Sequence, residues 1–487
     1  MKIKTTLLSL LHLLFILGAC NSKKQLRTNI VPERPNVLFI AVDDLNDWIG
    51  VLGGHPQAKT PYMDRLAQRG VLFSNAHCQA PVCNPSRASV MTSLYPSTSG
   101  IYFLNPDITE SPVASNNIVM PKRFQQEGYK VFAAGKIFHN GKGINETHIP
   151  NYAGQFGGFG PIPEKKISTY PGHPLWDWGG YPESDAQMPD YQIASWAEKR
   201  LAEKQEQPFW MGVGFYRPHV PQYAPQKWFD MYPLESVQLP SAITEDLNDI
   251  SSYGRDITRL NHVSPTFEWV TGNNEWKPLV QSYLACVSFV DNQVGRVITA
   301  LDNGDYGKNT YVVLFSDHGF HLGEKERFAK RSLWEDGARV PLIIIGPGIP
   351  KGKVINKPVQ LLDIYPTLLE LTNLKPDPQH EGNSLVPLLM NSDSKWPHFA
   401  RTCFGPGNYA IISERYRYIQ YNDGSEEFYD HKNDPQEWDN AIRNVEYANI
   451  IAQHRLQVPQ ERYKILGQGS TGHESYEATE KKKSRLD

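Results

Sequence analysis

The stretch Pro35-Asn36-Val37-Leu38-Phe39-Ile40-Ala41-Val42-Asp43-Asp44 is an apolar run that ends in two carboxylates. Such a continuous run is typical of a strand that is buried on both faces of a parallel sheet. It therefore predicts a central strand, with Asp43 and Asp44 at the carboxyl end, where open α/β sheets hold their functional sites. Adjacent carboxylates repel each other unless a cation joins them, which favours a metal site over the alternative of an exposed turn.

The rest of the chain alternates strands and helices. Apolar runs predict strands over residues 71–73, 129–134, 208–215, 310–316 and 340–345, and periodic segments predict helices over residues 60–70, 120–127, 190–203, 279–301 and 361–371. This order predicts an α/β fold built on a doubly wound sheet. Beyond residue 395 the strands become short, which predicts a small antiparallel subdomain. Residues 467–487 contain few apolar side chains, and they are predicted to be a disordered tail.

A second stretch, Cys83-Asn84-Pro85-Ser86-Arg87-Ala88-Ser89-Val90-Met91-Thr92, places a cysteine just ahead of a predicted helix. Asn84 is expected to cap this helix, and Pro85 suits its first turn, where a missing N–H costs nothing. Cys83 then faces the positive end of the helix, with Arg87 close to the same face. This indicates an anion pocket whose cysteine is either a nucleophile of lowered pKa or a modified residue. The alternative is an ordinary capped helix beside a buried cysteine.

Polar side chains also follow the other predicted strands. They are Lys136 and His139 after residues 129–134, His219 after residues 208–215, Asp317 and His318 after residues 310–316, and Lys330 in the loop beyond. Carboxylates can hold a metal and cations can hold an anion, and the two together are the apparatus for transferring a tetrahedral oxyanion group. Taken singly, each of these residues would more often be a solvated surface residue.

The stretch from Cys83 resembles the sulfatase signature C-x-P-S-R-x-x-x-[LM]-T-G, whose cysteine is converted to Cα-formylglycine. The match covers Cys83, Pro85, Ser86, Arg87, Met91 and Thr92, and it departs at Ser93 and Leu94. Three further segments resemble the iduronate-2-sulfatase group, which includes bacterial sulfatases of ulvan and glycosaminoglycans. They are Gly135-Lys136-Ile137-Phe138-His139, Arg217-Pro218-His219-Val220-Pro221 and Asp317-His318-Gly319. The resemblance is thus to the type I, formylglycine-dependent sulfatases of the alkaline-phosphatase superfamily.

This resemblance implies a fold and a domain organisation. A large alkaline-phosphatase-like α/β domain is expected over residues 34–390, with a doubly wound mixed sheet that carries helices on both faces. A small antiparallel α+β subdomain is expected over residues 391–466.

The resemblance also implies a site that binds one calcium ion (Ca2+). The implied ligands are Asp43, Asp44, Asp317, His318 and the modified Cys83, and the implied catalytic residues are Cys83, Arg87, Lys136, His139, His219 and Lys330. Ligand chemistry alone leaves manganese and zinc open, because calcium prefers oxygen and His318 offers nitrogen.

In the implied reaction the modified cysteine is a hydrated aldehyde, and one of its two hydroxyls attacks the sulfur of the ester. Lys136, Lys330 and His219 would neutralise the sulfate oxygens, and His219 or Lys330 would protonate the leaving alcohol. His139 and Arg87 would help the second hydroxyl to release sulfate. A formylglycine-generating maturation enzyme is the implied protein partner.

The substrate implied by the resemblance is a sulfated, uronate-containing poly- or oligosaccharide of the ulvan or glycosaminoglycan type. Arg217, His321 and Arg331 lie near the site residues in sequence and could pair with its carboxylate. One alternative is a phosphoesterase or phosphonate hydrolase of the same superfamily. Another is a lipid-anchored carbohydrate-binding protein with an inactive site. The net charge of −3 gives no support for nucleic acid as a partner.

The first residues are predicted to be an export signal rather than part of the fold. Lys2 and Lys4 precede an apolar run over residues 7–17 that is too short to span a bilayer. Leu17-Gly18-Ala19-Cys20 looks like a bacterial lipobox, which implies a lipoprotein signal peptide over residues 1–19, lipidation of Cys20 and a tether over residues 20–33. A plain secretory signal is the alternative. We therefore expect the chain at the bacterial cell envelope, lipid-anchored at the periplasmic face or in the outer membrane.

Overall fold

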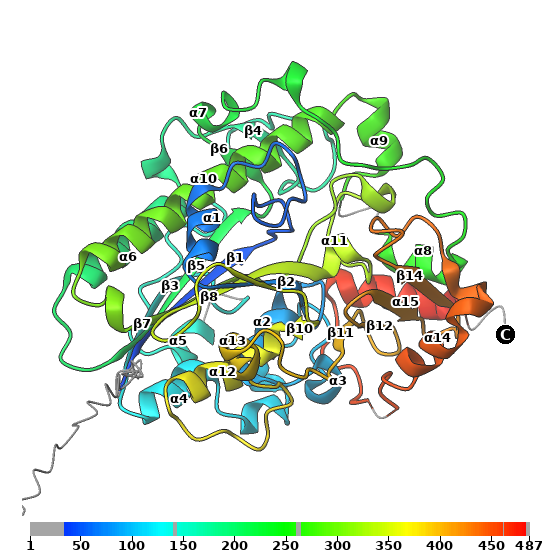
Figure 1. Ribbon diagram of the computed structural model, residues 1–487. Helices are drawn as coiled ribbons and strands as arrows, with labels where there is room; N and C mark the ends of the chain where they lie inside the picture. The colour runs from blue at the N-terminus through cyan, green and yellow to red at the C-terminus, as the bar shows by residue number, and fades with distance from the viewer. Residues whose placement is uncertain (1–33, 140–143, 260–263, 461, 484–487) are drawn as a thin grey trace, which may run out of the picture. The chain divides into compact units, whose positions relative to one another are not determined.

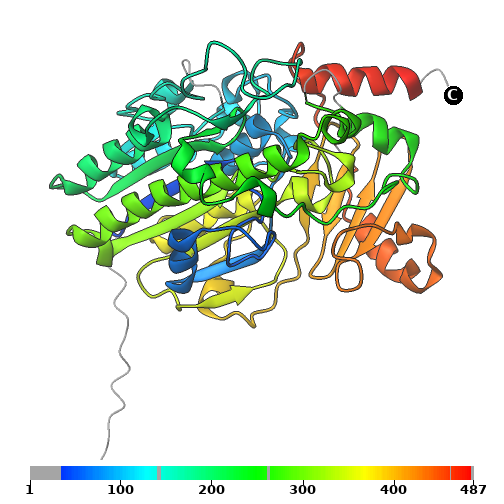
Figure 2. The same ribbon diagram turned by 90° about the horizontal axis from the view of Figure 1, so that it is seen from above.

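The computed structural model describes residues 34–139, 144–259, 264–460 and 462–483, and Figures 1 and 2 show it from two directions. The predicted signal peptide, the tether and Cys20 lie outside the described residues. Among the described residues, no helix has both the length and the apolar character that crossing a membrane requires.

A mixed sheet forms the centre of the fold. Its eight strands in the described part of the chain are β1 (Asn36–Asp43), β2 (Val71–His77), β3 (Lys130–Gly135), β5 (Phe209–Pro218), β7 (Thr310–Ser316), β8 (Arg339–Ile345), β9 (Lys353–Ile355) and β10 (Val359–Gln360). Their order is β10-β2-β8-β7-β1-β5-β3, and β9 pairs with β2. The strands predicted from apolar runs are all present.

Strand β1 is buried on both faces, as its sequence predicts. Every second residue from Val37 packs into one core, and every second residue from Leu38 packs into the other, because a strand repeats every two residues. Helices α1 (Pro61–Gln68), α6 (Pro189–Ala202) and α10 (Trp276–Asn303) cover one face, and α2 (Cys83–Thr92), α4 (Met120–Gln126), α12 (Ile364–Leu371) and α13 (Val386–Met390) cover the other (Figure 1). The prediction of a doubly wound mixed sheet with helices on both faces is confirmed.

Shorter elements lie in the connections. They are the helices α3 (Pro96–Ser99), α5 (Ile144–His148), α7 (Gln226–Phe229), α8 (Ser252–Thr258), α9 (Phe267–Gly272) and α11 (Glu335–Ala338), and the strands β4 (Trp178–Gly180) and β6 (Gln222–Ala224). β4 and β6 pair in a separate two-stranded sheet, which joins the long segment before α6 to the chain that follows β5.

The strand directions bring five strand ends to one edge of the large sheet. β1 runs parallel to β5 and β7, and β3 runs parallel to β5. β8 runs antiparallel to both β7 and β2, so β2 has the same direction as β7. The segments that follow β1, β2, β3, β5 and β7 therefore meet at one edge, as the carboxyl ends of parallel strands do.

A small antiparallel sheet follows, as predicted. Its strands are β11 (Ala400–Cys403), β12 (Tyr409–Ile412), β13 (Tyr416–Gln420) and β14 (Glu426–Asp430), and α14 (Ala448–Arg455) contacts β12 and β13. Thr402 Oγ1 donates a hydrogen bond to Cys78 O at 2.6 Å, and Cys403 N donates to Gln79 O at 2.9 Å. These bonds tie the small sheet to the segment that leads from β2 into α2.

The prediction of a disordered tail is wrong for residues 471–483, which form helix α15 (Thr471–Lys483). The rings of Tyr476 and Phe103 lie 5.9 Å apart between centroids. Lys483 Nζ donates to Asn422 O at 2.7 Å, and Figure 2 shows α15, in red, beside the small sheet. Composition did not reveal this helix because its packing depends on aromatic contacts and hydrogen bonds rather than on an apolar stripe.

Candidate active site

Helix α2 begins at Cys83, and Val82, in an extended conformation, precedes it as the cap residue without a side-chain hydrogen bond. The prediction that Asn84 caps the helix is wrong, because Asn84 lies inside the first turn. Its Nδ2 donates instead to Phe103 O at 2.9 Å and to Pro106 O at 2.8 Å. Asn84 thus anchors the loop after α3, while Cys83 still lies at the positive end of α2.

Three carboxylates, those of Asp43, Asp44 and Asp317, are fully buried where the neighbouring strands β1 and β7 end. Val42 pairs with Ser316 in the sheet, so the residues after them leave the two strands side by side. Asp44 has a positive φ of 61°, and its backbone N–H donates to Asp317 Oδ1 at 3.2 Å. Three negative charges this close repel one another strongly unless cations offset them.

Each of these carboxylates contacts a cation, and of these cations Arg87 and Lys136 are buried while Lys330 is partly exposed. The pairs are Arg87 with Asp317 (Nε to Oδ2, 2.7 Å) and with Asp43 (NH2 to Oδ1, 3.5 Å), Lys136 with Asp43, and Lys330 with Asp44 (Nζ to Oδ1, 2.7 Å). Burial by itself raises a carboxyl pKa, but the charge of Lys136 holds the pKa of Asp43 below its usual range. Burial raises the pKa of Asp317 to about 6, because the charge of Arg87 offsets only part of the lost hydration.

The Cys83 thiol lies beside His318, whose Nε2 is 3.1 Å from Cys83 Sγ. His318 Nδ1 is 3.1 Å from Gly319 O, and since a carbonyl only accepts, Nδ1 carries a proton and donates it. Burial raises the pKa of a thiol, but the charges of Lys136 and Lys330 outweigh burial and bring the pKa of Cys83 well below its ordinary value. In its unmodified form the residue is therefore more acidic than an inert buried thiol.

The same side chains form a candidate metal centre. Ligand atoms of Asp43, Cys83, Asp317 and His318 lie within 4.8 Å of one another, and so do those of Asp43, Asp44, Cys83 and His219. Carboxylate oxygens dominate the combined set, which suits a hard divalent cation, while the histidines add nitrogen. A divalent cation would also offset the repulsion among the carboxylates, so the residues fit such an ion.

Two histidines lie on the open side of this centre. His219 Nδ1 is 2.6 Å from the carbonyl oxygen of the next residue, which makes Nδ1 the donor and turns Nε2 toward Asp44 Oδ2, 3.9 Å away. The ring of Phe159 stacks on His219 with centroids 4.8 Å apart. His139 hydrogen-bonds with the Cys83 side chain, and burial lowers the pKa of His139, so the ring is neutral at neutral pH and can accept a proton.

A cavity of about 480 Å³ opens above Cys83. Polar residues that line it are Cys83, Asn105, His139, His173, His219, Ser264, Lys330, Arg331 and Ser470, and apolar residues include Leu104, Phe159, Leu175, Trp176, Val220 and Phe320. Asn105, His173, Trp176 and Ser470 were not found from the sequence, because no motif marks them. The aromatic-rich segment before α6, which contributes Phe159 and Trp176, was the one available signal.

The structure brings together every residue that the sequence assigned to metal binding and catalysis. Of the three residues that the sequence suggested for binding a sugar carboxylate, only one lines the cavity. Arg331 lines the cavity, whereas Arg217 donates to Tyr223 O at 2.7 Å and Phe159 O at 2.8 Å. His321 also lies outside the lining residues, with Nε2 at 2.6 Å from Ser332 Oγ.

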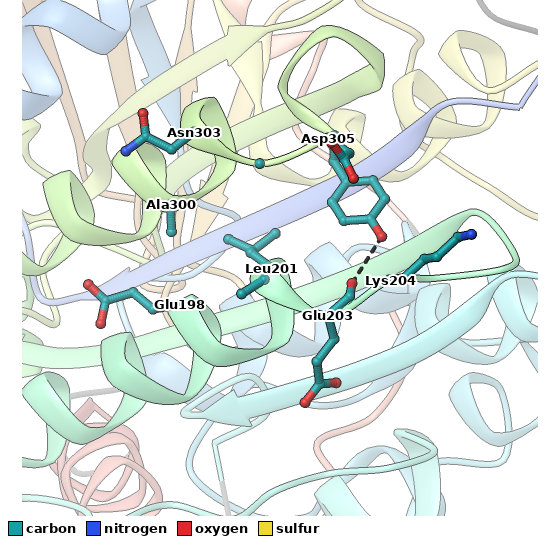
Figure 3. Close-up of a pocket in the computed structure, with 10 residues that line it drawn as sticks. Glu198, Leu201, Glu203, Lys204, Ala300, Asn303 and Asp305 are labelled. Carbon is teal, nitrogen blue, oxygen red and sulfur yellow. Dashed lines mark hydrogen bonds between the residues drawn. The ribbon is translucent and has the colours of Figure 1, made fainter.

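A second cavity, of about 430 Å³, lies between the C-terminal parts of α6 and α10 (Figure 3). Its lining includes Glu198, Leu201 and Asn303, and beside them Tyr306 OH donates to Glu203 O at 2.9 Å. These helices lead into the amino ends of β5 and β7, so the cavity lies at the sheet edge opposite Cys83. No histidine or cysteine is among its lining residues, and it offers no comparable chemistry.

A candidate nucleophile, a carboxylate-rich metal centre and buried cations at the ends of parallel strands define a hydrolase of tetrahedral oxyanion esters. The chain belongs to the sulfatase family: the family model described as Sulfatase matches residues 35–374. A model described as N-sulphoglucosamine sulphohydrolase, C-terminal, matches residues 323–464. The chain is therefore a sulfuric ester hydrolase, and the resemblance predicted from its motifs is confirmed. The predicted domain boundary at residue 390 stays a prediction, since the two matches overlap.

Curated relatives cover between 72% and 91% of the chain. A sulfatase from Formosa agariphila is 44% identical over 91% of this chain and 91% of its own length. An ulvan-active sulfatase from the same organism is 32% identical over 90% of this chain and 83% of its length. Iduronate 2-sulfatase of Mus musculus is 31% identical over 72% of this chain and 71% of its length.

Solved structures share the fold at lower identity. A 2-O GAG sulfatase matches with a TM-score of 0.65 at 23% identity, over 93% of this chain and 94% of that chain. The phosphonate monoester hydrolase of Agrobacterium radiobacter matches with a TM-score of 0.68 at 21% identity, over 87% of this chain and 95% of that chain. The architecture is therefore common to hydrolases of different oxyanion esters.

The position of Lys136 depends on a close contact between β3 and β5, and a Gly214→Ala substitution tests it. A Cβ on Gly214 would lie 2.2 Å from Lys136 O, so the end of β3 must move and carry the ammonium with it. We expect the free energy of unfolding to fall by about 1–3 kcal/mol, and sulfate release to fall roughly 10²-fold as the cation leaves its place.

The matched control is Gly272→Ala, since a Cβ on Gly272 has no atom within 4 Å. Its melting temperature and sulfate release should stay at the level of the unsubstituted enzyme. If Gly214→Ala behaves like this control in both measurements, the β3–β5 contact does not position Lys136.

Proposed function

We propose that the chain hydrolyses sulfate esters of a uronate-containing saccharide, with Cys83 converted to formylglycine and calcium at the carboxylates. The main support for this proposal is the environment of Cys83. It is the first residue of α2, and the charges of Lys136, Lys330 and His318 lower the pKa of its thiol. A helix N-terminus and buried cations stabilise the negative charge of a transferring oxyanion group, and they do so best where water is excluded.

The hydrate of formylglycine would supply two hydroxyl groups. The first would lose its proton to Asp317 and attack sulfur, which breaks the S–O bond to the sugar, and ionisation of the second would release sulfate and restore the aldehyde. Lys136 and Lys330 would hold the sulfate oxygens. His219, in the form that is protonated at Nε2 as well as at Nδ1, would donate the Nε2 proton to the leaving alcohol. His139, kept neutral by burial, would accept the proton of the second hydroxyl. A thiol has no second hydroxyl, so it would remain blocked after one transfer.

Arg87 has a supporting part in this scheme rather than the direct part that the resemblance implies. All three nitrogens of its guanidinium contact protein oxygens, those of Asp317, Asp43 and the backbone of Lys136 and Ile137. These contacts connect α2 to the ends of β7, β1 and β3. We therefore propose that Arg87 positions the carboxylates and the backbone of Lys136.

Calcium is the proposed metal. Oxygens of Asp43, Asp44 and Asp317 would hold it, together with His318 and residue 83. When bound, it would act as a Lewis acid on a sulfate oxygen and lower the pKa of an attached hydroxyl.

The maturation enzyme would have to act before α2 packs. Cys83 is 1% exposed and Arg87 is 2% exposed, so the signature cannot be reached in the folded chain. We therefore propose that a formylglycine-generating enzyme modifies the chain during or before folding.

The names of two relatives support the substrate class. One is active on ulvan and the other is named for iduronate, and both match most of this chain. Phosphonate ester cleavage is a candidate side activity of the same site, because the phosphonate monoester hydrolase shares the fold. An aryl sulfate should turn over faster than an aryl phosphonate monoester, and the reverse order would contradict the sulfate-ester assignment.

We also propose that lipid on Cys20 anchors the enzyme at the bacterial envelope. The support is the Leu17-Gly18-Ala19-Cys20 sequence. Fractionation tests this: the wild-type chain should sediment with membranes, and a Cys20→Ser chain should not.

Active protein should carry formylglycine at residue 83. The peptide that contains this residue should be about 18 Da lighter than its cysteine form, and Cys83→Ala should lower sulfate release by roughly 10³-fold or more. Cys286→Ala is the control, because Cys286 is buried in α10 with its thiol pKa raised by burial to about 12, and sulfate release should persist. Full activity with an intact Cys83 thiol would contradict the proposal.

A metal at the carboxylates should stabilise the fold, because it offsets their repulsion. Chelation should lower the melting temperature, and calcium at 100 times its Kd should restore about 2.7 kcal/mol. Asp44→Asn should abolish this shift, whereas Asp302→Asn, at an exposed ion pair with Arg69, should keep it. A melting temperature that responds to neither chelator nor calcium, manganese or zinc would exclude a metal at this site.

The substrate class is tested by offering the purified enzyme oligosaccharides of ulvan, heparin, chondroitin and carrageenan and measuring released sulfate. We expect release from saccharides that contain uronate. Activity confined to the uronate-free galactans would show that the substrate assignment is wrong even though the chemistry is right.

A further inference from the structure

Arg331 lines the cavity above Cys83, yet the proposed chemistry gives it no task. The neighbouring Lys330 reaches Asp44, and Lys136 and Arg87 reach the other carboxylates. Arg87 contacts both Asp317 and Asp43, so each of the three carboxylates has at least one of these cations beside it. Arg331 adds a further positive charge to the wall of the cavity.

The backbone at Arg331 is held in an uncommon conformation that brings its side chain to the cavity. Its φ is +74°, in the left-handed region, and its N–H donates to Pro81 O at 3.1 Å. Successive side chains of an extended segment point in opposite directions, so Lys330 and Arg331 could not both face the cavity without such a turn. A left-handed arginine costs about 1–3 kcal/mol, and such strain is concentrated at functional sites.

The charge of Arg331 persists at neutral pH although the side chain is only 6% exposed. Burial lowers the pKa of Arg331 to about 10, while the negative charges of Cys83 and Asp44 oppose that shift. A buried guanidinium at a cavity wall strongly favours an anion there, and its planar fork suits a carboxylate or a sulfate bound by two hydrogen bonds.

The size and lining of the cavity suit a substrate of one or two sugar rings that carries its negative charges close together. Phe159, Leu175, Trp176 and Phe320 provide an apolar lining, while Lys330 and Arg331 are adjacent in the chain. A volume of about 480 Å³ lies in the range of sites that enclose small ligands, where a few polar groups set the orientation.

We propose that Arg331 binds a second anionic group of the substrate sugar, in addition to the sulfate that is cleaved. The uronate carboxylate is the group we favour, and a second sulfate has the same recognition chemistry. The inference rests on the proposed function and deepens it, because it assigns the selection of an acidic sugar to one side chain.

The test uses three methyl glycosides of 2-O-sulfated idose that differ only in carbon 6, which is a carboxylate, a hydroxymethyl group or a sulfated hydroxymethyl group. Wild-type enzyme should show kcat/KM at least tenfold higher on the carboxylate than on the hydroxymethyl glycoside, since hydrogen bonds to charged groups contribute that much. A still higher value on the sulfate glycoside would identify sulfate as the preferred second anion. Equal values on all three would overturn the inference.

Arg331→Gln should reduce this ratio of kcat/KM values to near one, chiefly by raising KM for the anionic substrates. Arg331→Lys should keep part of the ratio, because it retains the charge but not the planar fork. If Arg331→Gln lowers kcat/KM equally for all three glycosides, Arg331 acts on the cleaved sulfate or on the fold, and the inference fails. If Arg331→Gln does not fold, the Arg331→Lys variant decides, since an unchanged ratio in that variant would overturn the inference.

The outcome also separates this inference from the proposed function. Sulfate release without discrimination at carbon 6 would leave the sulfatase reaction in place and remove the role of Arg331. No release from any of the three glycosides would overturn the uronate-sulfate assignment, and the inference with it.

Discussion

The carboxylates of Asp43, Asp44 and Asp317 share one buried corner where β1 and β7 end, and their repulsion constrains the rest of the site. Two unit charges about 4 Å apart interact by roughly 4 kcal/mol at an effective dielectric constant of 20. The compensating cations come from α2, from the end of β3 and from the loop after β7. Because removing one partner of a buried pair costs about 3–5 kcal/mol, these elements must pack together for the corner to exist at all.

The position of the Lys136 ammonium depends on close backbone contacts between β3 and β5. Gly135 has a φ of +77°, and a Cβ there would lie 2.0 Å from Gly214 O, so side chains are excluded from both glycines. Lys136 N then donates to Gly214 O at 2.9 Å, which fixes where the lysine leaves β3. The positions of the charges are therefore set by how closely the strands approach, and only secondarily by the flexible side chains.

The sequence predicts the parts of this arrangement that are local. The apolar run before Asp43 predicts a buried strand, and the position of Asp43 and Asp44 after it predicts carboxylates at the carboxyl end of that strand. Contacts between distant segments could not be predicted from the sequence. Asn84 has the right residue type for a helix cap, but its side-chain amide donates to the carbonyl oxygens of Phe103 and Pro106 instead. Helix α15 was missed for the same reason, since the partners of its side chains lie in distant segments. Arg331 and Arg217 look equivalent in sequence, and only the fold distinguishes their surroundings.

The negative charges of the buried carboxylates also disfavour an unmodified, ionised cysteine at position 83. A thiolate there adds a fourth negative charge, which raises the pKa values of Asp43 and Asp317. The hydrate of an aldehyde is neutral, so the proposed conversion would remove that charge while keeping an oxygen nucleophile at the helix end. The cations that lower the pKa of the cysteine would then act on the oxyanion of the substrate. In this view Lys136, Lys330 and the N-terminus of α2 serve the transferred group, and the three carboxylates serve the metal.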